Sequence, residues 1–278
     1  MYIEYFVNFN RGISEEEAEI VVAHLGQTTF ESFQTEEEGV KAYIQDTERN
    51  TTEIQDILSA LEKLYQFKVE EKEIQDTNWN EQWEKDYEPV FVNDICVIRA
   101  PFHNIKPLPE YDIIIEPKMA FGTGHHETTF LISDFLFSLP IKNKEICDAG
   151  TGSGVLSIIA SKLKAKHIFA YDIDEWSYNN TKENLKINKI QNVTIQQGDV
   201  SLIKNKTFDL ILANINRNIL LNDVKAFSES LSSKGTLIVS GFYAQDLPII
   251  IKEFEKNNLK LDTFKNKNNW IAAVFKKL

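Results

Sequence analysis

The first 74 residues alternate between strand-like and helix-like patterns of apolar residues. Alternation over residues 2–9 predicts a strand, and Ser14 followed by three glutamates predicts a helix that runs to about Leu25. The pattern then predicts two short strands, a helix and a final strand, at residues 29–33, 40–44, 52–65 and 67–74. The order βαββαβ is typical of a ferredoxin-like α+β domain, a fold that does not by itself indicate a chemistry.

From Phe130 onward, near-continuous apolar strands alternate with helices. Five strands are expected, at residues 145–147, 168–171, 193–196, 208–213 and 236–240. Three helices are expected between them, at residues 155–164, 175–188 and 245–257. This order predicts a Rossmann-like, doubly wound and mostly parallel sheet. Two last apolar runs, 259–264 and 270–275, are predicted to form an antiparallel hairpin at one edge of that sheet.

Residues 77–118 are predicted to connect the two domains, which gives expected segments 1–76, 77–118 and 119–278. The connector contains Trp79 and Trp83, which share one face if the segment is helical and are expected to anchor it by packing. It also contains three short strand-like runs that are expected to lean on the second domain, at residues 90–92, 95–99 and 113–115.

The composition is that of a globular protein. Apolar residues make up 42% of the 278 residues and charged residues 26%, and no apolar run approaches the roughly 18 residues that cross a bilayer. The first residues lack the basic and long apolar regions of a secretory signal. Only two cysteines are present, Cys96 and Cys147, which indicates a reducing compartment. We therefore expect a cytoplasmic protein with no membrane partner.

The net charge of −12 is concentrated in the first domain. Residues 1–76 contain 18 acidic and 6 basic side chains, and the remaining residues contain 24 of each. A strongly acidic domain repels nucleic acid and attracts basic partners, so direct binding of nucleic acid is not expected. Solubility explains the same charge equally well, and both interpretations stay open on composition alone.

The most informative motif is a run of three alternate glycines between a strand and a helix. Gly150, Gly152 and Gly154 follow Asp148 in the pattern D-x-G-x-G-x-G, whereas the dinucleotide fingerprint is G-x-G-x-x-G. Glycines here allow the backbone to approach a ligand closely. The spacing is that of S-adenosylmethionine (SAM) methyltransferases. No Walker motif is present, which disfavours a P-loop nucleotide hydrolase.

Several acidic residues follow the predicted strands. Asp172 ends the second strand, where its carboxylate can accept both hydroxyls of an adenosine ribose; NAD enzymes use the same device, so SAM and NAD both remain open. Asp174 is expected to begin a helix rather than bind a ligand. Asp199 lies either near an adenine edge or in an exposed turn.

Asn214 ends the fourth strand, above the crevice where open α/β sheets bind ligands. Methyltransferases of conjugated amines carry Asn-Pro-Pro-aromatic at this position. Because the prolines and the aromatic residue are absent here, a flexible aliphatic amine becomes an admissible acceptor.

The segment 119–129 is rich in glycine and precedes a helix. Its His126 and Glu127 do not continue into the H-E-x-x-H pattern of a zinc enzyme, so no metal site is expected. Thr128 or Thr129 is expected to cap the helix, or Thr129 to bond the amino-acid end of the cofactor.

Five motifs together resemble one family, the PrmA methyltransferases of the bacterial large-subunit ribosomal protein L11. They are Trp79-Asn-x-x-Trp83, Ala120-Phe-Gly-Thr-Gly-x-His126-x-Thr-Thr129, Asp148-x-Gly-x-Gly-Ser-Gly154, Tyr171-Asp-Ile-Asp174 and Ala213-Asn-Ile. The resemblance covers nearly the whole chain. Two positions depart from the family pattern, His125 and Glu127, so no roles are carried over to them.

The resemblance implies a SAM-dependent N-methyltransferase that modifies the terminal α-amino group and lysines of one basic ribosomal protein, which the small acidic domain recognises. By matching positions it also implies that Thr129, Gly150, Asp172 and Asn214 contact the cofactor, together with the neighbouring Gly152 and Gly154.

Two catalytic roles are hypotheses drawn from the residues. Asn214 is expected to orient the lone pair of the acceptor amine, and His126 either relays the departing proton or only orders its loop. Three alternatives remain open: a SAM methyltransferase of another protein or a small amine, an NAD-dependent oxidoreductase, and an acidic binding module without enzymatic activity. We expect a monomer.

Overall fold

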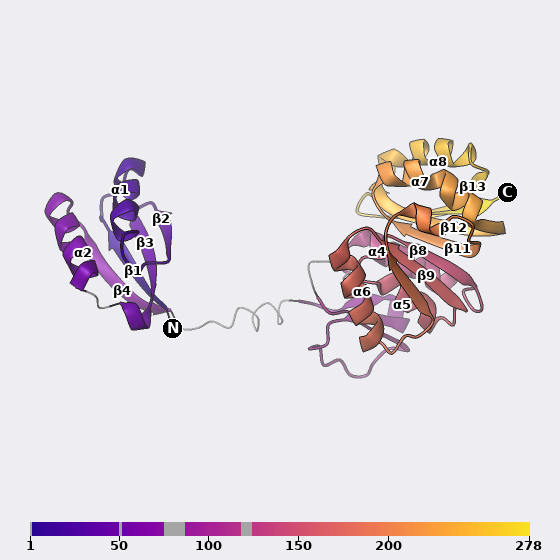
Figure 1. Ribbon diagram of the computed structural model, residues 1–278, viewed down its shortest axis with the longest axis horizontal. Helices are drawn as coiled ribbons and strands as arrows, with labels where there is room; N and C mark the ends of the chain where they lie inside the picture. Colours follow the sequence, from indigo (N-terminus) through magenta and orange to yellow (C-terminus); the bar gives the residue numbers. More distant parts are fainter. Residues whose placement is uncertain (1, 50–51, 75–86, 118–123) are drawn as a thin grey trace. The chain divides into compact units, whose positions relative to one another are not determined.

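The computed structural model describes residues 2–49, 52–74, 87–117 and 124–278, and the chain divides into two compact units, residues 1–87 and 88–278 (Figure 1). The predicted boundaries after residues 76 and 118 both fall outside the described residues, as do Trp79 and Trp83. No helix in the described part of the chain is long and apolar enough to span a membrane.

The first unit is the predicted ferredoxin-like domain. Its elements are β1 (Tyr2–Asn8), α1 (Glu15–Leu25), β2 (Ser32–Glu36), β3 (Gly39–Gln45), α2 (Thr52–Leu64) and β4 (Lys68–Ile74). The strands are antiparallel in the order β2-β3-β1-β4. Helix α1 begins where predicted, because Ser14 and Glu17 form a reciprocal capping box: the Ser14 hydroxyl accepts from the Glu17 N–H, and the Glu17 carboxylate accepts from the Ser14 N–H.

The second unit contains a seven-stranded sheet in the order β10-β9-β8-β11-β12-β14-β13. Its strands are β8 (Glu145–Ala149), β9 (His167–Asp172), β10 (Val193–Gln197), β11 (Phe208–Asn214), β12 (Leu231–Tyr243), β13 (Leu259–Lys267) and β14 (Trp270–Lys277). The first five strands in the order are parallel, and β12, β14 and β13 pair antiparallel. The predicted doubly wound sheet with an antiparallel edge is confirmed.

Five helices cover the two faces of this sheet. They are α4 (Glu127–Ser138), α5 (Val155–Lys162), α6 (Glu175–Ile187), α7 (Arg217–Ser230) and α8 (Leu247–Glu255). Apolar residues of α4, α5 and α6 pack into one buried cluster, and those of α7 and α8 pack into another on the opposite face. The strand order reverses between β8 and β11, which places a crevice at the carboxyl ends of these two strands.

A second, three-stranded sheet belongs to the same unit. It consists of β5 (Val90–Val92), β6 (Cys96–Arg99) and β7 (Tyr111–Ile114), in that order. Val92, Ile98 and Ile113 are buried in the cluster that α4 and α5 form with the large sheet. The three short strands predicted in the connector therefore pack on the second unit.

Two expectations about elements were wrong. The strand predicted near residues 29–33 is β2, at Ser32–Glu36; only its first two residues fall within the predicted range, and its partly polar sequence gives a weak alternation signal. Helix α7 was not predicted at all. Asn216 caps it by accepting from the Ile219 N–H, but polar residues on its exposed face obscure the helical pattern of Leu220, Val224 and Phe227.

Candidate functional site

The three glycines form the turn between β8 and α5. Gly150, Gly152 and Gly154 have φ angles of 68°, 58° and 82°, a region that favours glycine. A Cβ at Gly150 would also lie 2.4 Å from the Cγ2 atom of Ile215, so a larger residue does not fit without a shift. The Gly150 N–H donates to the Tyr171 carbonyl at 2.9 Å, which ties the turn to the end of β9.

Asp148 supports this turn from inside the protein. It is buried, and its carboxylate accepts the hydroxyl protons of Thr151 at 2.8 Å and Ser157 at 2.6 Å. Burial raises the pKa of Asp148, although both hydroxyl bonds oppose the shift. Thr151 belongs to the glycine turn and Ser157 to α5, so these two hydrogen bonds of Asp148 stabilise the turn.

Asp172 ends β9 and faces the glycine turn. One carboxylate oxygen accepts from the Gly152 N–H at 2.9 Å, and the other accepts from the Asp174 N–H at 3.0 Å. These two backbone bonds fix the orientation of the carboxylate. Each oxygen retains acceptor capacity, so the group can also accept the two hydroxyls of a ribose.

A cavity of about 360 Å³ opens at the carboxyl ends of the parallel strands. Four of the predicted cofactor residues line it: Gly150, Gly152, Asp172 and Asn214. Its apolar lining comes from four residues, Ile173, Val200, Ile215 and Ile219. Polar side chains at its border include Tyr171, Asp199 and Asp223. Apolar walls with a few convergent polar groups suit an adenosine-containing ligand, so the residues present fit the expected cofactor.

Asn214 carries an unsatisfied acceptor. Its Nδ2 donates weakly to the Thr129 hydroxyl at 3.4 Å, and its Oδ1 is buried with no hydrogen-bond partner in the described part of the chain. A buried acceptor without a partner is destabilising by about 1–3 kcal/mol. Such an atom at the edge of a cavity is suited to accept an N–H from a bound ligand.

Thr129 and Gly154 do not line this cavity. Thr129 is fully buried at the start of α4, where its hydroxyl accepts from Asn214. Gly154 begins α5, and a Cβ there would lie 2.9 Å from the Cγ2 atom of Thr181, so glycine allows α5 and α6 to pack closely. Direct contact of Thr129 and Gly154 with the cofactor stays a prediction.

His126, and neither Thr128 nor Thr129, caps helix α4. Its Nδ1 accepts from the Thr128 N–H at 3.2 Å and lies 2.8 Å from the Thr128 hydroxyl. Its ring packs edge-on against Trp270, with ring centroids 4.6 Å apart. The expectation that a threonine caps this helix was wrong, because the residue before Glu127 already supplies an acceptor in an extended conformation.

The neighbours of His126 serve other contacts. The His125 Nε2 lies 2.7 Å from the Glu88 carbonyl, and the Glu127 carboxylate accepts from Asn268 Nδ2 at 2.9 Å. Within residues 2–49, 52–74, 87–117 and 124–278, no group of three or more His, Cys, Asp or Glu side chains is arranged to hold a metal ion.

The two remaining aspartates cap the helical segments that follow β9 and β10. Asp174 caps α6 by accepting from the Ser177 N–H at 2.8 Å, and this bond lowers the pKa of Asp174; its expected role as a helix start is confirmed. Asp199 accepts from the Ser201 N–H at 2.9 Å and also lines the cavity. The interpretation of Asp199 as an exposed turn residue is therefore confirmed, and its position near an adenine edge stays a prediction.

Sequence reasoning missed the residues that α7 and β9 add to the cavity. Ile219 and Asp223 lie one turn apart on α7, which was not predicted. Tyr171 was expected in a strand and in the motif that ends at Asp174, but it was given no role at the site. One signal was available in the sequence. Ile173 is an apolar residue directly after the predicted ligand residue Asp172, and it also lines the cavity.

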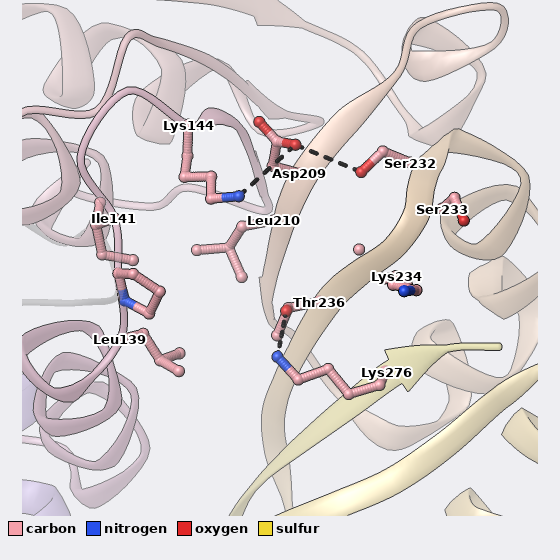
Figure 2. Close-up of a pocket in the computed structure, with 12 residues that line it drawn as sticks. Leu139, Ile141, Lys144, Asp209, Leu210, Ser232, Ser233, Lys234, Thr236 and Lys276 are labelled. Atoms are coloured by element: carbon pink, nitrogen blue, oxygen red, sulfur yellow. Dashed lines mark hydrogen bonds and ion pairs between the residues drawn. The ribbon is translucent and has the colours of Figure 1, made fainter.

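A second cavity, of about 250 Å³, lies at the opposite end of the same strands (Figure 2). Two of its charged groups are already paired. The Asp209 carboxylate accepts from the Ser232 hydroxyl at 3.4 Å and from the Glu145 N–H at 3.0 Å. The Lys276 ammonium donates to the Thr236 hydroxyl at 2.7 Å. Among the described residues, no buried polar atom of this cavity lacks a hydrogen-bond partner, and none of the predicted site residues lines it.

Comparison with known proteins matches the chain to one family. The family model described as ribosomal protein L11 methyltransferase (PrmA) matches residues 9–278. The chain is 41% identical over 261 residues to the ribosomal protein L11 methyltransferase of Phocaeicola vulgatus, with 92% of each chain covered. It is 42% identical over 266 residues to that of Porphyromonas gingivalis, covering 92% of this chain and 90% of the relative.

A solved structure agrees with these matches. The crystal structure of ribosomal protein L11 methylase from Lactobacillus delbrueckii subsp. bulgaricus superimposes with a TM-score of 0.65 and 30% sequence identity. The match covers 69% of this chain and 99% of that one. With the glycine turn, Asp172 and Asn214 in place at the sheet crevice, the chain belongs to the PrmA family of ribosomal protein L11 methyltransferases, which are SAM-dependent enzymes.

Proposed function

We propose that this protein transfers methyl groups from SAM to amines of ribosomal protein L11, namely its N-terminal α-amino group and lysine side chains. The relatives at 41–42% identity carry the L11 substrate in their names, and the chain matches them over 92% of its length. We also propose that the protein is a cytoplasmic monomer. Its partner is a protein substrate, and it does not bind nucleic acid directly.

The observation that carries the proposal is the buried, unpartnered Oδ1 of Asn214 at the border of the cofactor cavity. An amine acceptor has N–H donors, and one of them can satisfy this atom. The same bond turns the nitrogen lone pair toward the cavity. Methyl transfer to nitrogen is an in-line displacement, so this alignment is the main contribution that the protein can make to the rate.

The methyl donor would be held by residues already in position. The glycine turn offers close backbone contact at Gly150 and Gly152, and Asp172 offers carboxylate oxygens for the ribose hydroxyls. When bound, the cofactor supplies a methyl group on a positively charged sulfur. Ile215 and Ile219 line the cavity with apolar side chains, which would limit contact of the bound cofactor with water.

The acceptor amine must be neutral before it reacts. A lysine with a pKa of about 10.4 is neutral roughly once in 2,500 at pH 7, which costs about 4.6 kcal/mol, whereas an α-amine with a pKa of about 8 costs about 1.4 kcal/mol. Transfer of the amine into an apolar channel lowers its pKa and favours the neutral form. His126 is our candidate to relay the released proton. Because its Nδ1 accepts from the Thr128 N–H, the relay would pass through Nε2.

The acidic first unit supplies a surface for a basic protein substrate. The start of α1 and the turn between β2 and β3 are adjacent, since the Ile13 N–H donates to the Glu37 carbonyl at 3.1 Å and the Phe9 N–H donates to the Glu38 carbonyl at 2.8 Å. This brings two glutamate clusters together, Glu15–Glu17 and Glu36–Glu38. We infer that this acidic cluster attracts the substrate.

The proposal is tested by methylation of unmodified L11. The full chain is incubated with isotopically labelled SAM and L11 that was produced without methylation, and the modified residues are mapped by mass spectrometry. We expect label on the α-amino group and on lysines. Label on a small amine or on another ribosomal protein, with L11 unmodified, would contradict the substrate assignment. Calorimetric titration with S-adenosylhomocysteine and with NAD separates methyltransferase from oxidoreductase, because tight binding of NAD alone would exclude the proposal.

A further inference from the structure

Tyr243 and Trp270 form a stacked aromatic pair at the carboxyl end of the large sheet. Their ring centroids lie 4.1 Å apart, and the angle between the ring planes is 35°. Tyr243 is nevertheless 45% exposed, so part of its ring surface stays open to solvent. The face of an aromatic ring carries partial negative charge and attracts cations, including ammonium groups. An exposed ring that a second ring holds in place is therefore a candidate binding surface for a cation.

The register of the strands places this pair on the same side of the sheet as the Asn214 amide. Asn214 pairs with Ser240 of β12, and Tyr243 follows three residues later, roughly 10 Å further along the strand. Trp270 is the partner of Tyr243 on β14 and packs against the buried cluster of α4, α5 and α6. The Asn214 amide is directed to the same helices, because its Nδ2 donates to the Thr129 hydroxyl of α4 at 3.4 Å. The pair therefore lies beyond the strand end next to Asn214, on its α4 side.

His126 lies in contact with the aromatic pair. Its ring packs edge-on against Trp270, with centroids 4.6 Å apart. His126 also caps α4, one helical turn before Thr129, whose hydroxyl contacts the Asn214 amide. The candidate proton relay thus connects the aromatic pair with the residue that is expected to orient the acceptor amine.

Two contacts fix Tyr243 relative to the loop that follows β11. Gly241, two residues earlier, approaches this loop so closely that a Cβ would lie 2.1 Å from the Ile215 carbonyl oxygen. The Asp246 carboxylate accepts from the Tyr243 N–H at 3.4 Å and forms an ion pair with Arg217 at 2.6 Å. Asp246 therefore anchors the backbone of Tyr243 and balances the charge of Arg217, which would otherwise repel a cation.

Glu127 supplies a negative charge close to Trp270. Its carboxylate accepts from Asn268 Nδ2 at 2.9 Å, in the two-residue turn before Trp270. This hydrogen bond lowers the pKa of Glu127, and the charge of Lys267 lowers it further, so the carboxylate is charged at neutral pH. A carboxylate near an aromatic face favours a cationic ligand over a neutral one.

We propose that Tyr243, backed by Trp270, binds the side chain of a substrate lysine in its charged ammonium form as the lysine approaches the methylation site. This inference rests on the proposed function, since it concerns an amine acceptor on a protein. A lysine reaches the enzyme from water almost entirely in its charged form, which cannot accept a methyl group. The open ring of Tyr243 attracts this cation and also offers an apolar surface to the aliphatic part of the lysine side chain. Tyr243 is thus a positioning residue, which holds the lysine near Asn214 and takes no part in the methyl transfer itself.

The test is the steady-state kinetics of lysine methylation in unmodified L11 by the full chain, with the modified lysines measured by mass spectrometry. Tyr243→Leu keeps an apolar side chain but removes the ring. We expect it to raise KM for L11 about 2- to 5-fold at unchanged kcat, the loss expected from one partly exposed contact between a cation and an aromatic ring. Tyr243→Phe keeps the ring and should stay close to the wild type, because the hydroxyl is not needed to attract the cation.

Phe264→Leu is the matched control, because Phe264 is an aromatic residue of β13 that is 49% exposed. It should leave KM and kcat unchanged. Thermal melts and calorimetric titration with S-adenosylhomocysteine establish that all variants are folded and bind the cofactor product equally. An unchanged KM in Tyr243→Leu, an equal increase in Tyr243→Phe or Phe264→Leu, or a loss confined to kcat would overturn the inference while leaving the proposed function intact. No methylation of L11 by the wild type would overturn both.

Discussion

The two ends of the large parallel sheet carry cavities of similar size and opposite character. At the carboxyl ends of the strands, the Asn214 Oδ1 and the Tyr171 hydroxyl are buried and have no hydrogen-bond partner in the described part of the chain. At the amino ends, Asp209 and Lys276 already bond to neighbouring side chains (Figure 2). Native proteins seldom leave buried polar groups unpaired, so the unpaired set marks the end of the sheet that is built for a ligand.

The largest expected effect comes from filling the glycine turn. Gly150→Ala would place a Cβ 2.4 Å from Ile215 and force a residue with φ of 68° to carry a side chain. We expect the affinity for S-adenosylhomocysteine, measured by calorimetry, to fall at least about 100-fold, because clash and strain each cost on the order of 1–3 kcal/mol. Gly235→Ala is the control at the amino ends, where a Cβ would lie 2.8 Å from the Ser232 carbonyl oxygen. Equal loss of affinity in both variants would contradict the conclusion that the cofactor binds at the carboxyl ends of the strands.

Removal of the orphaned acceptor should lower the rate more than the affinity. With Asn214→Ala, methylation of L11 at saturating SAM should slow by about 100-fold, since the amine loses the group that orients it. Asn214→Asp keeps an acceptor and should retain more activity than the alanine variant. A rate for Asn214→Ala within twofold of the wild type would show that Oδ1 does not position the acceptor.

The proton relay can be separated from the helix cap. His126→Asn keeps an acceptor that can cap α4, and asparagine is among the preferred residues at that position. If His126 relays the proton, this variant should melt like the wild type and methylate roughly tenfold more slowly at pH 6.5, with a smaller deficit at pH 8.5. Full methylation by His126→Asn at pH 6.5 would leave His126 with its capping role alone.

A smaller effect is expected from the acidic cluster of the first unit. Two of its six glutamates form ion pairs and are left unchanged: Glu17 pairs with Arg11 at 2.6 Å, and Glu36 pairs with Lys41 at 3.3 Å. The other four are suited to substitution, namely Glu15, Glu16, Glu37 and Glu38. Changing these four to glutamine should weaken L11 binding about fivefold at low salt and flatten its salt dependence, with unchanged affinity for S-adenosylhomocysteine. The control changes Glu229 and Glu255 of the second unit. If the dependence of L11 affinity on salt concentration did not change, the acidic residues would serve solubility and not substrate binding.

The smallest effect is expected at the amino ends of the strands. Asp209→Asn removes an ion pair with Lys144, whose N···O distance is 3.9 Å, but keeps an acceptor for the Glu145 N–H. We expect the free energy of unfolding to fall by less than about 1 kcal/mol, and cofactor affinity to stay the same. A large loss of cofactor affinity would mean that the two ends of the sheet are coupled.

Local patterns in the sequence predicted most of the fold and the part of the site that lies on strand ends. The glycine turn, Asp172 and Asn214 were found because each directly follows an apolar run, and parallel strands bring such positions together. Helix α7 was missed because its apolar stripe is narrow. The sequence therefore offered no reason to place Asp223 and Ile219 at the cavity. Tyr171 has the sequence pattern of an ordinary core residue, and only the structure shows that its hydroxyl has no partner among the described residues. The capping role of His126 likewise depends on the conformation of a residue that no local pattern predicts.

The most direct test of the whole account is a crystal structure of the protein with S-adenosylhomocysteine. We expect the ligand at the carboxyl ends of β8, β9 and β11. There the ribose hydroxyls should bond to Asp172, with Asn214 Oδ1 facing the sulfur end. Binding in the cavity beside Asp209 and Lys276, or in the first cavity with the ribose away from Asp172, would contradict this expectation.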